Sequence, residues 1–318
     1  MALKGIGVLL GCAAALVVTT ACTAEYRETR AEQAYPPVGD FLSVNGTRVH
    51  YVTKGEGTDL VLIHGASGNL RDFTFSLIDK LSERYRVTAF DRPGMGYTDR
   101  VDPEHGTTII EQALLLADAS NQLGLDRPMV LGHSYGGAVA LAWAVERPDS
   151  LSALILLAAA SNPWNSDLST YYKVTSSDLG SALAVPAITA FTPSSVVHDV
   201  IDGIFAPQEP PEGYHDHIGA PLTLRRKSMR ANAAQRANLL GEIEALHTRY
   251  DAIDVPTEIV HGDADTTVGL SIHSIPLSKQ IDGANLTVLD GIGHMPHHAA
   301  EPEVIDAIDR AARRAGLR

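Results

Sequence analysis

The sequence predicts an α/β fold built on a mostly parallel sheet. Three observations predict it. Short apolar runs of strand length alternate with amphipathic stretches of helix length, most apolar runs are continuous, and the alternation is interrupted once, between residues 161 and 250. Continuous apolar runs are typical of strands buried on both faces, and strand–helix alternation implies parallel strands joined by helical crossovers. The 318 residues suffice for one large α/β domain or two small ones.

The first predicted element is a β-hairpin within residues 41–55. It turns at Asn45-Gly46, a dipeptide that favours the tight turn in which both residues take positive φ. The elements expected next are a strand at 59–65, a helix at 69–82, a strand at 85–91, a helix at 107–124, a strand at 128–133, a helix from about 136 that ends at Pro148, and a strand at 151–160.

The pattern then changes to helices and loops over residues 161–250, with no convincing pair of strands. We expect this insertion to form a lid near the carboxyl ends of the strands, the edge at which such sheets bind ligands. The strands then resume, with a strand at 257–263, a helix near 269–281, a strand at 285–290 and a last helix at about 301–315. The predicted core therefore comprises residues 40–160 and 251–318.

The composition is that of an ordinary globular protein, with 45% hydrophobic and 20% charged residues. The formal net charge of −13 argues against a nucleic-acid partner, which would require a basic surface. An acidic, solvated surface that keeps the protein soluble is the simpler interpretation. The sequence does not indicate an oligomeric state.

The N-terminus has the layout of a secretory signal. Lys4 is followed by an apolar run from Gly5 to Val18 and then by small residues. We predict a signal peptide of the lipoprotein type at residues 1–22, and hence an exported protein that is attached to the cell envelope or is periplasmic or secreted. The apolar run is close to the length of a membrane span, so an uncleaved anchor is the alternative. Membrane contact is expected only through this segment.

Cys22 is the predicted site of lipid attachment. It follows the residues VTTA, which resemble the motif before a lipidated cysteine, although Thr19 stands where leucine is usual. The alternative is ordinary cleavage near Ala21 that leaves a free thiol. Cys12, the second of the two cysteines, would be removed on cleavage, so no intramolecular disulfide is expected. Residues 23–39 are polar and contain a double proline, which predicts a flexible tether.

Ser134 is the candidate nucleophile. A serine hydroxyl needs a base within hydrogen-bond reach and a sharp turn that lifts it clear of its own backbone. The stretch LGHSYGG supplies glycine two residues before and after Ser134, where side chains would collide, and it lies between a predicted strand and a predicted helix. Gly137 would let that helix pack closely against the strand.

An acid and a histidine should follow the serine in that order. Asp263 and Asp265 follow the strand at 257–263, and we prefer Asp265 because it lies further along the loop. His294 is the best placed of the histidines in the final loop, because it follows Gly293 directly. The alternatives are Asp263 as the acid and a metal cluster of His294, His297 and His298. No cysteine or carboxylate at zinc-like spacing lies nearby, so we expect no metal and no other cofactor.

An oxyanion hole needs two backbone N–H donors. We expect one from Tyr135, the residue after the nucleophile, and one from Ala66, in the loop after the strand at 59–65.

The chain resembles the α/β-hydrolase superfamily in its lid-bearing branch of esterases and related hydrolases. The resemblance rests on LVLIHGASGN, AFDRPGMGYTDR, LGHSYGGAVALAWAVERPD, VPTEIVHGDADTTV and DGIGHMPHHAAEPEV. It implies an α/β-hydrolase fold: a mostly parallel eight-stranded sheet flanked by helices, with a helical lid inserted after strand 6. It also implies a triad of Ser134, Asp265 and His294 with Ala66 and Tyr135 as oxyanion donors, and a mainly structural role for DRPGMGYTD.

The predicted function is hydrolysis of a small-molecule carboxylic ester through an acyl-enzyme. Haloalkane dehalogenases and epoxide hydrolases of the superfamily use an aspartate nucleophile, and the serine here argues against both chemistries. The alternatives are a carbon–carbon bond hydrolase or a cofactor-free perhydrolase with the same triad, and a non-catalytic surface lipoprotein. The basic run RRKSMR (225–230) is either a site for an anionic substrate or, more simply, a solvated helix face.

Overall fold

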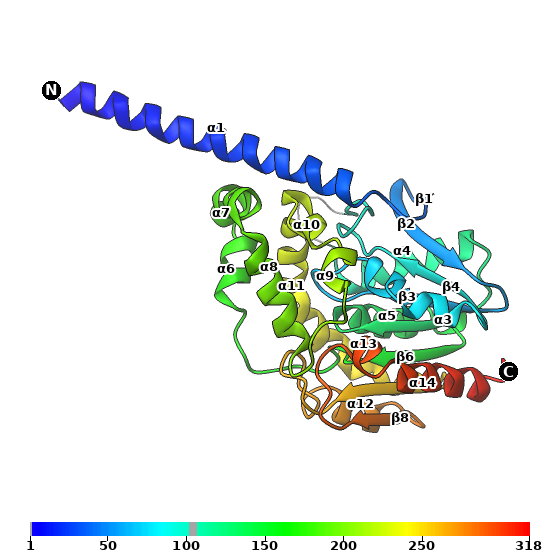
Figure 1. The fold of residues 1–318 in the computed structure, drawn as a ribbon. Helices are drawn as coiled ribbons and strands as arrows, with labels where there is room; N and C mark the ends of the chain where they lie inside the picture. Colours follow the sequence, from blue (N-terminus) through cyan, green and yellow to red (C-terminus); the bar gives the residue numbers. More distant parts are fainter. Residues whose placement is uncertain (1, 102–106) are drawn as a thin grey trace.

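The computed structural model describes residues 2–101 and 107–318, without the side chains of residues 2–10. In these residues, eight strands form one sheet. The strands are β1 (Asp40–Val44), β2 (Thr47–Lys54), β3 (Thr58–Ile63), β4 (Tyr85–Phe90), β5 (Met129–His133), β6 (Ala153–Leu157), β7 (Thr257–Gly262) and β8 (Asn285–Leu289). Their order is β1-β2-β4-β3-β5-β6-β7-β8 (Figure 1). The two pairs that include β2 are antiparallel and the other five are parallel. The predicted mostly parallel sheet is therefore confirmed.

The hairpin turn lies where the sequence predicts it. β1 and β2 pair around Asn45 and Gly46, which have φ of 51° and 85°. Both values lie in the left-handed region that the tight hairpin turn requires.

Helices cover both faces of the sheet and create two hydrophobic layers. Val61 and Ile63 of β3 point into the layer beneath α4 (Ile109–Gln122), α5 (Tyr135–Glu146) and α12 (Ser274–Gln280). Leu60 and Leu62 point into the opposite layer, beneath α2 (Arg71–Thr74), α3 (Leu77–Leu81) and α14 (Glu301–Arg314). Successive strand residues face opposite sides. Two covered faces therefore require an unbroken apolar run, which is the pattern that the sequence shows.

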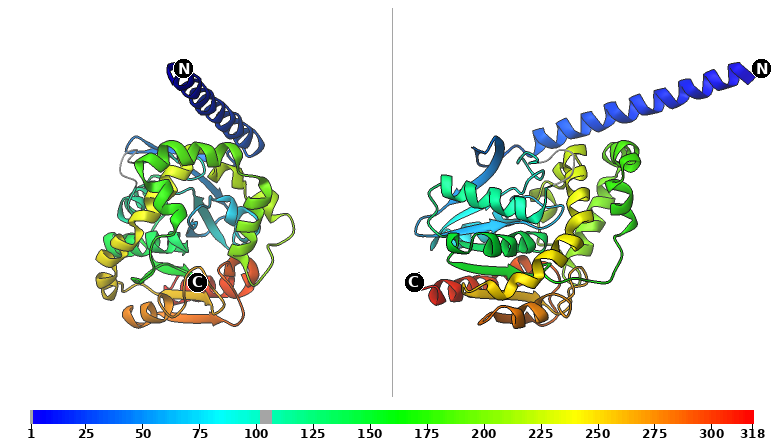
Figure 2. Two further views of the ribbon diagram at one scale, coloured as in Figure 1. Left: turned by 90° about the vertical axis from the view of Figure 1, so that its left-hand side faces the viewer. Right: turned by 180° about the vertical axis from the view of Figure 1, so that it is seen from behind.

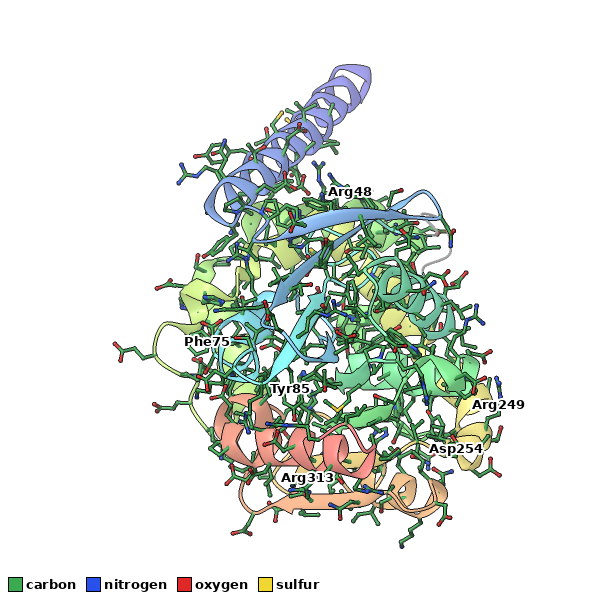
Figure 3. The ribbon with its side chains drawn as sticks, turned by 90° about the vertical axis from the view of Figure 1, so that its right-hand side faces the viewer. Arg48, Phe75, Tyr85, Arg249, Asp254 and Arg313 are labelled. Atoms are coloured by element: carbon green, nitrogen blue, oxygen red, sulfur yellow. The ribbon has the colours of Figure 1, made fainter. Side chains whose placement is uncertain are left out.

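Two predicted helices are shorter in the structure. The helix expected at 69–82 divides into α2 and α3, because Ser76 leaves the helical conformation (φ −150°) and its hydroxyl donates to Glu301 at the start of α14. The helix expected near 269–281 begins only at Ser274, because the preceding residues form a long loop after β7. Tyr85, the first residue of β4, lies beside α14 (Figure 3). Its hydroxyl donates to Asp309 of that helix.

A cap of six helices occupies the predicted insertion between β6 and β7. They are α6 (Thr170–Ser176), α7 (Asp178–Phe191), α8 (Ser194–Phe205), α9 (Tyr214–His217), α10 (Ala220–Thr223) and α11 (Arg226–Leu246). The cap helices gather at the end of the sheet where the parallel strands finish (Figures 1 and 2). The last turns of α11 return to the core, where Leu239, Ile243 and Leu246 are buried.

Among the described residues, no single helix has both the length and the apolar character needed to cross a membrane. α7 and α8 meet these criteria only when taken together, and they are bent by 100° at the break between them.

The prediction of a flexible tether at residues 23–39 is wrong for its first twelve residues. They continue helix α1 (Ala2–Ala34) and pack against α7 and α10 of the cap, with Ala24 and Ala31 buried. Glu28 accepts hydrogen bonds from the side chain and the backbone N–H of Arg226, at 2.7–2.9 Å. The sequence shows only a polar segment, because the basic partners of the acidic residues lie about 200 positions further on.

The basic run at 225–230 is consequently neither an open anion site nor a freely solvated face. Arg225 is fully buried and its Nη1 lies 2.8 Å from Glu32 Oε1, while Lys227 Nζ lies 3.3 Å from the same oxygen. This part of the run attaches α1 to the cap through ion pairs.

We predict that the attachment of α1 weakens in acid. Burial raises the pKa of Glu28, but its hydrogen bonds with Arg226 outweigh burial, so the pKa lies below the ordinary value of 4.5. The balance at Glu32 is similar, through Arg225 and Lys227. A lowered folded-state pKa means that the stabilisation is present above 4.5 and is lost as the pH falls through the folded-state value. Hydrogen exchange of residues 23–34, corrected for the intrinsic effect of pH, should therefore rise at low pH.

The double variant Glu28→Gln, Glu32→Gln should show fast exchange of these residues even at pH 7. Glu25→Gln is the matched control, because Glu25 is on the same helix, is 78% exposed and lies 3.9 Å from Arg226. Equal protection of residues 23–34 in the double variant and in the control would contradict this role of the ion pairs.

Candidate active site

Ser134 lies at the sharp turn between β5 and α5. Its φ of 53° and ψ of −118° are strained for a residue with a side chain. A Cβ added to Gly132 would lie 2.3 Å from the carbonyl oxygen of Gly136, and one added to Gly136 would lie 2.2 Å from that of Ile63. A Cβ on Gly137 would lie 2.3 Å from the Cβ of Ala159. The turn can therefore form only with glycine at these three positions.

The structure brings Ser134, His294 and Asp265 together from three separate loops. His294 Nε2 lies 2.9 Å from Ser134 Oγ, and His294 Nδ1 lies 2.7 Å from Asp265 Oδ2. An ionised Asp265 accepts only, so Nδ1 carries the proton and Nε2 is free to accept from the serine hydroxyl. The three side chains are almost fully buried. This chain of contacts can move a proton from Ser134 to His294.

Asp265 is held as a carboxylate. Oδ1 accepts from the backbone N–H groups of Thr267 and Val268 at 2.7 and 2.9 Å, and His261 Nε2 lies 3.1 Å from Oδ2. Burial raises the pKa of Asp265, but the hydrogen bonds from His261 and His294 outweigh burial and lower the pKa below its ordinary range. The negative charge beside His294 therefore persists at neutral pH.

The alternative acid and the alternative histidines lie elsewhere. Asp263 is exposed and accepts a hydrogen bond from the N–H of Gly291, away from Ser134. His297 and His298 each donate Nε2–H to the buried carboxylate of Asp72, at 3.0 and 2.8 Å. Neither residue reaches the serine.

Asp72 joins the histidine loop to the cap, and sequence reasoning missed it. Besides His297 and His298, it accepts a 2.8 Å hydrogen bond from the hydroxyl of Tyr214 in α9. Burial raises the pKa of Asp72, but the two histidines outweigh it and hold the pKa well below the ordinary value.

The same three side chains are the described residues that could hold a metal ion. The ligand atoms of Asp72, His297 and His298 lie within 4.8 Å of one another. Both Nε2 atoms are already hydrogen-bonded to the carboxylate, so a metal would have to displace two good hydrogen bonds. The arrangement therefore fits a structural network that positions α13 (Pro296–Ala299), directly after His294.

His133, immediately before the serine, supports the same loop. Its Nε2–H donates to the carbonyl oxygen of His294 at 3.0 Å. Burial, together with the neighbouring His297 and His294, lowers the pKa of His133, so the ring is neutral. The residue thus couples the nucleophile turn to the backbone that carries His294.

The loop after β3 approaches Ser134 closely. A Cβ added to Gly65 would lie 3.2 Å from Ser134 Cβ, so the residue before Ala66 lies directly beside the serine. The assignment of the Ala66 and Tyr135 N–H groups as oxyanion donors stays a prediction.

The buried guanidinium of Arg92 orients that loop. Its Nε donates to the carbonyl oxygen of His64 at 2.9 Å and its Nη2 donates to that of Gly65 at 3.0 Å. In a trans peptide the C=O and the following N–H point in opposite directions. By binding the Gly65 carbonyl, Arg92 therefore directs the Ala66 N–H away from itself. The sequence motif FDRPG contains Arg92, but nothing in it reveals that an arginine would be fully buried.

His64 completes this support in one defined tautomer. Its Nε2 accepts from the backbone N–H of Arg92 at 3.0 Å, so Nδ1–H donates to the Gly65 carbonyl at 2.9 Å. Burial, reinforced by the charge of Arg92, lowers the pKa of His64 to about 4. The ring is therefore neutral at physiological pH and keeps this hydrogen-bond pattern.

The cap also holds the loop. Asn232 of α11 accepts from the N–H of Ser67 and donates to its hydroxyl, both at 2.9 Å, and Thr223 donates to the Ser67 carbonyl at 2.8 Å. Asn69 donates to the carbonyl of Ile218 at 2.9 Å. No sequence pattern signals these contacts, because the paired residues are about 150 to 165 positions apart.

We predict that Arg92→Lys slows the reaction of Ser134 with a fluorophosphonate. A lysine cannot bind both carbonyls, so the Ala66 N–H would lose its orientation, and the rate constant should fall by about tenfold to a hundredfold. Arg225→Lys is the matched control, because Arg225 is equally buried and also binds two backbone carbonyls, those of Leu222 in the cap and Gly96 in the loop after β4. Melting temperatures would verify that both variants fold. The same rate constant in the two variants would argue against a role for Arg92 at this site.

The chain is similar to known proteins of the alpha/beta hydrolase fold. A sequence profile of this fold matches residues 59–199, which include Ser134. An uncharacterised Mycobacterium tuberculosis protein is 25% identical over 291 residues, which are 86% of this chain and 81% of that protein. Haloalkane dehalogenase 2 of the same species is 34% identical over 127 residues, 39% of this chain and 43% of the dehalogenase. The crystal structure of an alpha/beta hydrolase fold protein from Burkholderia ambifaria matches with a TM-score of 0.70 and 26% identity, over 86% of this chain and 97% of that one.

Proposed function

Because the chain belongs to the α/β-hydrolase superfamily and carries serine at the nucleophile turn, we propose that it is a serine hydrolase of carboxylic esters. The observation that carries the proposal is the unbroken contact from Asp265 through His294 to Ser134, at 2.7 and 2.9 Å. The substrate class is a small-molecule ester.

The reaction begins with attack of Ser134 Oγ on the ester carbonyl carbon. The hydroxyl proton passes to His294 Nε2, and Asp265 stabilises the imidazolium that forms. The N–H groups of Ala66 and Tyr135 stabilise the negative charge on the carbonyl oxygen. His294 then returns the proton to the alcohol as the ester bond breaks, which leaves an acyl group on Ser134. Water, activated by the same histidine, releases the acid.

Serine at this position separates the chain from the dehalogenase that it resembles in part. Dehalogenation requires a carboxylate nucleophile, whose alkyl ester water can hydrolyse. An alkyl group on serine would be an ether, which this machinery could not cleave. Acyl transfer is the chemistry that suits a serine with a histidine base.

We also propose that the protein is exported and is held at the cell envelope by a lipid on Cys22. The Cys22 side chain is exposed on α1, so it is accessible to acyl transfer. Incorporation of labelled palmitate should be lost in Cys22→Ala and retained in Cys12→Ala. Incorporation that survives in Cys22→Ala would contradict the proposal.

We predict that a fluorophosphonate labels Ser134 and that p-nitrophenyl esters are hydrolysed. In Ser134→Ala the labelling should disappear and kcat should fall by about 10⁴-fold or more, because the acyl-enzyme cannot form. Mass spectrometry of the adduct and steady-state kinetics provide the two measurements.

A substrate panel separates the alternatives that share the triad. Turnover of ring-fission diketones in preference to esters would indicate a carbon–carbon bond hydrolase, and peracid formation from peroxide and acetate would indicate a perhydrolase. A folded protein that neither reacts with the probe nor turns over any substrate would favour the non-catalytic binding lipoprotein.

A further inference from the structure

The outer surface of the cap carries a group of exposed apolar side chains. Their exposed fractions range from 46% to 71%, which is unusual for such large apolar residues on neighbouring helices. We call this group the apolar cap face: Leu179, Leu183 and Phe191 of α7, and Val196 and Val200 of α8.

The helices that form this face carry few charges. Asp178 is the only charged residue of α7, and α8 adds Asp199 and Asp202. Asp202 lies 2.9 Å from His215. The opposite end of the molecule differs, since Arg249 and Arg313 are exposed there (Figure 3). α7 and α8 therefore expose large apolar side chains with few charges among them.

The N-terminal helix extends from the same side. α1 packs along α7, and Arg27 donates to the carbonyl oxygen of Ala190 at 3.1 Å. Beyond this contact Leu16, Val17 and Val18 are 60–65% exposed. The start of α1 leaves the body of the protein on the side of α6 and α7 in each view (Figures 1 and 2). The apolar cap face and the apolar run of α1 are thus neighbours.

We propose that the apolar cap face docks on a phospholipid bilayer, with α7 and α8 in the region between headgroups and acyl chains. Helices with one apolar side lie in this region with that side towards the lipid. The 100° bend between α7 and α8 suits a surface contact better than a span. Two of the three interpretations of the N-terminus, a lipid on Cys22 and an uncleaved anchor, bring the bilayer to the start of the helix that packs on α7, and the proposal rests on one of these two. This inference does not depend on the proposed hydrolysis.

The test uses the full chain with Cys12→Ser and Cys22→Ser and one introduced cysteine. Leu183→Cys, labelled with an environment-sensitive NBD group, reports on the apolar cap face. Val288→Cys on β8 is the matched control, because Val288 is also apolar and is 47% exposed. The vesicles contain phosphatidylcholine and phosphatidylglycerol, and part of the phosphatidylcholine has brominated acyl chains that quench NBD.

At residue 183 we expect a blue shift on binding and at least about twofold quenching by the brominated lipid, as for a group buried among acyl chains. At residue 288 we expect neither. Val200→Cys should repeat the result on α8, and circular dichroism would verify folding. No quenching at residues 183 and 200 in protein that floats with the vesicles, or no flotation, would overturn the proposal. A blue shift without vesicles that grows with protein concentration would also overturn it, because a second copy would then cover the face.

Discussion

The contact between the Ser134 turn and the end of β3 is the constraint on which the site depends. Gly132, Gly136 and Gly137 leave no space for side chains, so the backbone of the turn lies directly against the end of β3 and against Ala159, just after β6. This packing holds Ser134 in a backbone conformation that costs about 1–3 kcal/mol. It also places the loop after β3 beside the serine. A substitution that adds one methyl group at these glycines would therefore disturb the proposed nucleophile and the proposed oxyanion loop together.

Buried charges organise the remainder of the site, and each has specific partners. Arg92 binds two carbonyls and two glutamine side chains. Asp265 accepts from two backbone N–H groups and contacts two histidines, and Asp72 accepts from two histidines and a tyrosine. A buried charge without partners would destabilise the fold strongly. With them, these charges define the positions of the loops that carry His294 and Ala66.

The cap contributes to the site and to the N-terminal attachment at once. α11 begins with the arginines that bind Glu28 and Glu32 of α1, and its next turns supply Asn232 to the loop beside Ser134. α9 supplies Tyr214 to Asp72. The segment that would connect the protein to a membrane and the loop that would stabilise an oxyanion are therefore linked through the same helices. A cap that docks on lipid would lie between the bilayer and the active site.

The sequence by itself determined the sheet, the hairpin and the turn that carries Ser134, because these depend on local signals: strand-length apolar runs, the Asn45-Gly46 turn, and glycines at set distances from a serine. For the acid and the base it narrowed the candidates to Asp263 or Asp265 and to the histidines of the final loop. Only the tertiary structure showed that Asp265 rather than Asp263 contacts His294, that Arg92 is buried beneath the loop after β3, and that residues 23–34 pack on the cap rather than form a tether. Each of these outcomes rests on hydrogen bonds or ion pairs between side chains far apart in the chain. Such partners leave no periodic pattern in the sequence, since their pairing depends on how the separate elements pack.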